Sequence, residues 1–178
     1  MRFVRFGVLA AGAGFTLGAV HYEALGVPPI PLSQHASVSQ SIAGTEITIE
    51  YNRPVARGRV IFGGVVPWDR VWCPGADTAT RLTVTRPIQV NGSTLPAGAY
   101  GIWAIPDSAR WTVIFSHAAH HFHVPYPEGQ DALRVTATPR AAPHMETLAF
   151  YFPMVDSTRA ELVLHWGETQ VPLAIVAQ

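Results

Sequence analysis

The stretch TEITIEY, residues 45–51, alternates polar and apolar side chains from Glu46 onward. Because successive side chains of a β-strand point to opposite faces of a sheet, Ile47, Ile49 and Tyr51 share one face. The polar side chains share the other face. The pattern therefore predicts a strand with one face in a hydrophobic core and one face in water.

Similar short segments follow this strand along the chain, separated by turn signals such as Asn91-Gly92. The 15 glycines and 15 prolines interrupt the sequence often, and no helical period follows the N-terminal segment. About nine short strands in series predict an all-β domain, an antiparallel β-sandwich or jelly roll. The other predicted strands span residues 81–85, 88–90, 100–105, 111–116, 133–138, 147–152, 160–166 and 171–176.

Composition narrows the classes of protein to consider. The 178 residues are enough for about one domain. With 48% hydrophobic and 13% charged residues, the chain has the material for a core and is not a disordered tail. Its 12 basic residues, all arginine, cancel its 12 acidic residues and form no basic run, so we expect no nucleic-acid partner.

The N-terminal segment, residues 1–25, has the layout of an export signal. Arg2 and Arg5 precede an uncharged apolar run over residues 6–20. We expect this segment to be retained as a single-pass transmembrane helix in the cell inner membrane, with the main domain in the periplasm. Cleavage of a signal peptide near Ala19 is the alternative.

Small residues are spaced by four in this segment: Ala10, Gly14 and Gly18 form a stripe on one helix face. Such a stripe lets another transmembrane helix approach closely, so the predicted partners are a membrane protein complex and the surrounding lipid. A proline-rich spacer over residues 26–34 should be extended and stiff. Residues 35–178 then form the extracytoplasmic β-sandwich domain.

Residues 51–80, YNRPVARGRVIFGGVVPWDRVWCPGADTAT, carry a long motif. Together with LPAGAY at 95–100 and AELVLHW at 160–166, it resembles a family of bacterial secreted proteins, domain of unknown function 2911. The resemblance implies a secreted or periplasmic β-sandwich and no particular activity. Cys73 stands where the family usually has arginine, and Asp77 where it usually has asparagine.

Arginines gather at the start of this motif. Arg53, Arg57 and Arg59, with Trp68 and Asp77 further on, are candidates for a protein interface or an anion site. Guanidinium groups bind carboxylates with two donors, and tryptophan and arginine are common interface anchors. The alternative is a set of structural arginine–aspartate pairs that tie a long loop to the sandwich.

Histidines form the one group with metal-ligand chemistry: His117, His120, His121 and His123. Two prolines follow closely, which favours a loop over a rigid strand, and no carboxylate lies nearby in sequence to orient the rings. A solvated or interface-forming loop is the alternative, and we expect no cofactor.

No enzyme motif is present. The chain has neither Gly-x-Ser-x-Gly nor a phosphate-binding loop, and Cys73 is its sole cysteine and should be buried. The first hypothesis is a non-enzymatic, membrane-anchored accessory subunit of a larger complex, such as a respiratory or photosynthetic assembly. The alternative is a periplasmic binding protein that uses the 53–59 loop or the 117–123 cluster for a small ligand or metal. A hydrolase is a weaker third reading.

Overall fold

The computed structural model describes residues 30–177, and in this part the chain forms strands and no helix. Accordingly, this part holds no helix long and apolar enough to cross a membrane. The predicted N-terminal helix, with Ala10, Gly14 and Gly18, and most of the predicted spacer lie outside the described residues. The strands are β1 (Gln34–Ile42), β2 (Thr45–Arg53), β3 (Arg81–Val84), β4 (Ile88–Val90), β5 (Ser93–Leu95), β6 (Gly98–Ile105), β7 (Trp111–Ser116), β8 (Asp131–Ala137), β9 (Arg140–Val155) and β10 (Arg159–Ala177).

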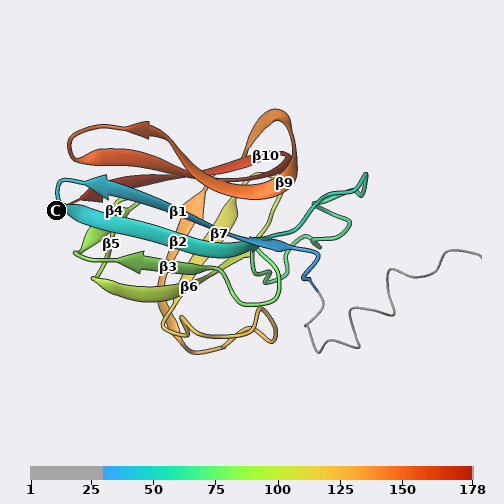
Figure 1. Ribbon diagram of the computed structural model, residues 1–178, viewed down its shortest axis with the longest axis horizontal. Coiled ribbons are helices and arrows are strands. Elements are labelled where there is room, and N and C mark those ends of the chain that lie inside the picture. The colour runs from blue at the N-terminus through green and yellow to red at the C-terminus, as the bar shows by residue number, and fades with distance from the viewer. Residues whose placement is uncertain (1–29, 178) are drawn as a thin grey trace, which may run out of the picture. The chain divides into compact units, whose positions relative to one another are not determined.

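The strands form two antiparallel sheets (Figure 1). One sheet has six strands in the order β1-β2-β3-β6-β7-β8, and the other has four in the order β5-β4-β10-β9. Neighbours in the first sheet follow one another along the chain, except where the β4–β5 hairpin joins the second sheet. The prediction of an all-β, sandwich-like domain is confirmed.

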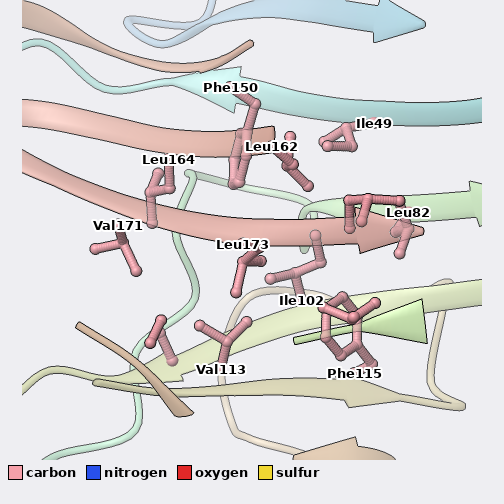
Figure 2. Close-up of a cluster of buried hydrophobic side chains, with 14 of the residues drawn as sticks. Ile49, Leu82, Ile102, Val113, Phe115, Phe150, Leu162, Leu164, Val171 and Leu173 are labelled. Atoms are coloured by element: carbon pink, nitrogen blue, oxygen red, sulfur yellow. The ribbon is translucent and has the colours of Figure 1, made fainter. Parts of the chain in front are cut away.

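One hydrophobic core lies between the sheets (Figure 2). Ile47, Ile49 and Tyr51 of β2 are buried in it, as the alternation predicts. The six-stranded sheet also contributes Leu82, Ile102, Val113 and Phe115, and the four-stranded sheet contributes Phe150, Leu162, Leu164, Val171 and Leu173. Alternation along each strand thus leaves the opposite face of each sheet for polar side chains and loops.

The strands differ from the sequence prediction in several places. The three-residue strand β5 was not predicted, and β9 runs over Arg140–Val155 where residues 147–152 were predicted. β1 was not predicted, because it lies at a sheet edge and its inward residues Ala36 and Val38 are only partly buried. β10 is one long strand where two were predicted, over 160–166 and 171–176. Gly167, with φ of 59°, lies at a register shift against β9, so the glycine accommodates a bulge inside a continuous strand.

Two loops cover part of the outer face of the six-stranded sheet. The signature loop, residues 54–80, joins β2 to β3, and the histidine loop, residues 117–130, joins β7 to β8. They enclose a second, smaller core cluster of Cys73, Ala79, Trp103 and Ile114. This cluster fixes both loops against the sheet.

Gly101 of β6 makes that close approach possible. A Cβ atom at this position would lie 2.3 Å from the Trp103 ring and 2.8 Å from the carbonyl oxygen of Ala118. Any side chain would therefore push the histidine loop away from the sheet.

Candidate functional site

Aromatic rings hold the signature loop to the end of the sandwich. The Trp72 ring stacks on Trp166 of β10, with centroids 6.1 Å apart, and meets the edge of Trp111 of β7 at 6.3 Å. Phe62 packs edge-on against Trp111 at 4.9 Å. The backbone of Trp72 also pairs with that of Ala104 in β6. The loop is therefore a packed part of the domain.

Two of the candidate arginines bind main-chain carbonyls. Arg53 Nε donates to the carbonyl of Leu148 at 2.9 Å, which ties β2 to β9. Arg59 donates to the carbonyls of Val55 and Ala56 at 2.8 and 2.9 Å, which closes the first turn of the loop. Both side chains thus stabilise the loop, through backbone oxygens and not through the aspartates considered from sequence.

Arg57 is different. Its backbone is left-handed, with φ of 51°, and its N–H donates to the Glu146 carboxylate at 2.6 Å. Hydrogen bonds from His144 and from this N–H hold the pKa of Glu146 below its usual value. No residue of the described part forms a hydrogen bond or ion pair with the Arg57 guanidinium. With Arg59, it lines a cavity of about 270 Å³ beside the rings of Trp72 and Trp166.

Asp77 lies with the histidine loop. Its backbone is also left-handed, with φ of 60°, and its carbonyl accepts hydrogen bonds from the backbone N–H of His123 at 3.0 Å and from His123 Nδ1 at 2.7 Å. These bonds join the two loops. The structure thus separates the roles of Asp77 and the arginines, which sequence proximity had grouped.

Trp68 is an exposed residue of the signature loop. Its side chain is 41% exposed, and its ring lies 6.1 Å from Phe62. A Cβ atom at Gly63, where φ is 83°, would lie 2.6 Å from Trp68 Nε1, so only glycine leaves room for this ring. Trp68 and Arg59 line a further cavity of about 310 Å³.

The loop also exposes aliphatic side chains. Val60 is 72% exposed, and Val65 and Val71 are each about two-fifths exposed. We call Val60, Val65, Trp68 and Val71 the apolar loop surface. Leu32, where the compact domain begins, is 77% exposed and lines the same cavity as Val65.

The four histidines have separate partners. His121 Nε2 lies 2.9 Å from the Pro125 carbonyl, and His117 packs beside the Tyr100 ring. His120 faces Arg81 of β3, and His123 bonds to Asp77 as described. Within residues 30–177, no three His, Cys, Asp or Glu side chains are arranged so that they could hold a metal ion.

Sequence reasoning missed a polar pocket on the outer face of the six-stranded sheet. It has a volume of about 220 Å³ and lies between β1, β2, β3 and the two loops. Arg81 forms an ion pair with Glu50 inside it, and His120 lies at its wall. The only signal in the sequence was the polar face of residues 45–51. This pattern does not identify the loops that cover that face.

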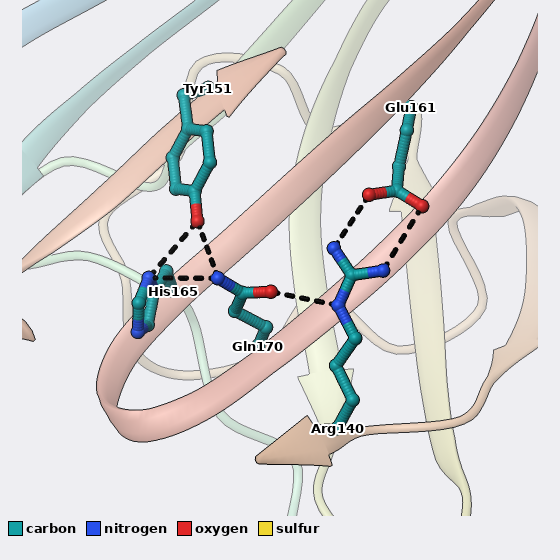
Figure 3. A network of polar contacts seen from close by, with 5 residues as sticks. All are labelled: Arg140, Tyr151, Glu161, His165 and Gln170. Carbon is teal, nitrogen blue, oxygen red and sulfur yellow. Dashed lines mark hydrogen bonds and ion pairs between the residues drawn. The ribbon is translucent and has the colours of Figure 1, made fainter. Parts of the chain in front are cut away.

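A polar network lies on the four-stranded sheet (Figure 3). Arg140 binds Glu161 at 2.6 Å and Gln170 at 2.7 Å, and Gln170 donates to the Tyr151 hydroxyl at 2.7 Å. That hydroxyl lies 3.1 Å from Nδ1 of His165, which is only 4% exposed. The network links β9 to β10 on both sides of the bulge and so stabilises the long hairpin.

Cys73 is buried, as predicted, and is the only cysteine of the chain. Burial raises the pKa of its thiol to about 12, against a smaller opposite effect of a backbone hydrogen bond from Thr80. The thiol is therefore protonated at neutral pH and is a poor nucleophile.

These features define a β-sandwich-like domain with a rigid, aromatic-anchored loop that carries exposed apolar and arginine side chains at one end. The chain belongs to the family described as "Protein of unknown function (DUF2911)", whose family model matches residues 33–175. This confirms the resemblance found from the motifs. Neither the curated proteins nor the solved structures include a match to the chain.

Proposed function

We propose that this protein is a non-enzymatic accessory subunit, anchored in the cell inner membrane, whose periplasmic sandwich docks on a larger membrane protein complex. The observation that carries the proposal is the apolar loop surface. Ten large hydrophobic side chains are exposed within residues 30–177, and four of them fall between Val60 and Val71. Scattered exposed apolar residues need no explanation, but a concentration of them in one loop points to a contact surface.

The loop is suited to binding because it is already rigid. Backbone hydrogen bonds from Gly63, Val65 and Val66 close tight turns inside it. The rings of Trp72 and Phe62 fix the loop to the sandwich by packing against Trp166 and Trp111. A preformed surface loses little conformational entropy on docking, so more of the contact energy remains as affinity.

The chemistry of the surface favours a protein partner. Trp68 is an exposed aromatic side chain of the kind that anchors interfaces. The Arg57 guanidinium, which has no hydrogen-bond or ion-pair partner within residues 30–177, belongs to the same loop. Arginine reaches carboxylates and carbonyl oxygens of a partner with several donors at once. The partner face should therefore be apolar at its centre and acidic at its rim.

The membrane part of the proposal rests on sequence. Arg2, Arg5 and the apolar run after them predict the anchor, and the stripe of Ala10, Gly14 and Gly18 predicts a helix that packs on other transmembrane helices. A respiratory or photosynthetic assembly is the kind of partner that we would examine first.

The test uses native membranes without overexpression. We would solubilise them in mild detergent, separate the complexes by size, and measure the intact mass of this chain wherever it migrates. The proposal expects a full-length chain in a large assembly. A chain trimmed near Ala19 that migrates alone would refute it.

Variants connect this assay to the loop. Trp68→Ala should release the chain from the assembly while the domain stays folded. Met154→Ala is the matched control, because Met154 is an exposed apolar residue outside the signature loop. It lies on β9 of the four-stranded sheet, whereas the signature loop joins two strands of the six-stranded sheet. Equal release by both variants would show that the apolar loop surface has no special role.

A second candidate function is periplasmic binding of a small anionic ligand. The observation in its favour is the cavity lined by Arg57, Trp72 and Trp166, because the Arg57 guanidinium has no hydrogen-bond or ion-pair partner among the described residues. This function expects a soluble mature domain whose melting temperature rises with a carboxylate ligand. The rise should disappear in Arg57→Gln.

A further inference from the structure

The polar pocket on the outer face of the six-stranded sheet has no part in the proposed docking. Its floor consists of His35 of β1, Glu50 and Asn52 of β2, and Arg81 of β3. Its walls come from the two loops, with Thr78 on one side and His120 on the other. Segments far apart in the sequence therefore build a single concave site.

Sheet register sets the positions on the floor. His35 lies directly opposite Asn52, and Glu50 lies directly opposite Arg81. The walls are held by a hydrogen bond from the Ala79 backbone to the His121 carbonyl, at 2.9 Å. The pocket is thus formed before any ligand binds, as small-molecule sites usually are.

The ion pair on the floor leaves hydrogen-bonding groups unused. Arg81 Nε and Nη2 both contact the same oxygen of Glu50, Oε2. The other oxygen, Oε1, accepts no hydrogen bond from a residue of the described part. Asn52 donates its amide N–H to the Ala76 carbonyl at 3.0 Å, and this leaves its amide oxygen as a second acceptor.

His120 lies within hydrogen-bond distance of Arg81. Arg81 Nη1 is 3.3 Å from Nδ1 and 3.4 Å from Nε2 of His120. Nη1 can share its N–H between these two nitrogens or donate it to one of them. At least one ring nitrogen is therefore left for another partner.

The charges on the floor cancel. Glu50 and Arg81 neutralise each other, so a charged ligand would find no opposite charge that is not already paired. A hydroxyl group both donates and accepts, which matches the mixture of acceptors and imidazole nitrogens in the pocket. The volume of about 220 Å³ is below the roughly 300–1,000 Å³ of sites for drug-sized ligands. We propose that this pocket binds a neutral sugar or polyol no larger than a single sugar ring.

Ligand-observed saturation-transfer NMR tests the proposal on the full chain, in a zwitterionic detergent without a sugar headgroup. The probes are glucose, galactose, mannose, N-acetylglucosamine and myo-inositol at about 10 mM, with glucuronate and glucosamine as charged analogues. At least one neutral probe should bind saturably and more tightly than both charged analogues. Glu50→Gln replaces a charged acceptor by a neutral amide and removes the ion pair to Arg81, and His120→Ala removes the ring nitrogens, so each should weaken that binding about tenfold.

Two matched variants control for unspecific effects. Glu46→Gln changes a carboxylate on the same strand and face, and His117→Ala changes a histidine of the same loop, and neither lines the pocket. Both should bind the sugar as the unmodified protein does. The proposal is overturned if no neutral probe binds, if a charged analogue binds more tightly, or if the pocket variants and the controls behave alike.

Discussion

Replacing Trp72 by alanine should detach the signature loop from the end of the sandwich. The ring lies 6.1 Å from Trp166, 6.3 Å from Trp111 and 6.0 Å from Phe62, and each such aromatic pair contributes about 0.5–1.5 kcal/mol beyond burial. Removing a large ring from such surroundings costs about 3–5 kcal/mol, and Trp72 is only partly buried. We therefore expect Trp72→Ala to lower the free energy of unfolding by about 3 kcal/mol.

Urea unfolding of the full chain, followed by circular dichroism, measures this loss. Trp68→Ala is the control, because it removes the same side chain from the same loop at a more exposed position with one aromatic neighbour, and should cost about 1 kcal/mol. Limited proteolysis should cut within residues 54–80 in Trp72→Ala and leave the control intact. If the two variants lose equal stability, or if proteolysis still spares the loop in Trp72→Ala, the reasoning on ring packing is wrong.

Three further predictions concern other parts of the domain. Gly101→Ala places a methyl group 2.3 Å from the original Trp103 ring position, so thermal unfolding should show a loss of about 1–3 kcal/mol; an unchanged melting temperature would contradict the close packing. Cys73, with a thiol pKa raised to about 12, should stay unreactive toward a thiol reagent at pH 8 until denaturant is added, and rapid labelling of the native protein would contradict its burial. Tyr151→Phe removes the hydroxyl next to His165 and should cost about 1 kcal/mol in urea unfolding, whereas a neutral effect would show that the network adds no stability.

Sequence alone predicted the features that depend on neighbouring residues. Alternation over 45–51 marked a half-buried strand, and β2 spans it. Asn91-Gly92 marked a tight turn, and both residues have positive φ, at 46° and 82°, between β4 and β5. These patterns are local, because side-chain direction and turn geometry follow from the residues on either side.

The polar pocket could not be predicted in this way. Glu50 and Arg81 are 31 residues apart, and Arg81 and His120 are 39 apart, so their contact depends on strand order and register. The role of Arg53 was hidden for the same reason, because Leu148 lies 95 residues away. A backbone carbonyl such as that of Leu148 carries no sequence signal, although it is what Arg53 binds.

The position of β10 in the chain has a consequence for biogenesis. Of the ten described strands, β10 (Arg159–Ala177) comes last along the chain, yet it contributes Leu162, Leu164, Val171 and Leu173 to the core. Its neighbour β9 is also distant from β2 along the chain, because the backbone N–H of Phe150 donates to the Tyr51 hydroxyl 99 residues away. Ile47 and Ile49 of β2 therefore stay exposed to solvent until the hairpin of β9 and β10 has been synthesised and packs against them. Such long-range pairing folds slowly and leaves apolar surface open to aggregation, so folding should depend on protection of the incompletely folded chain.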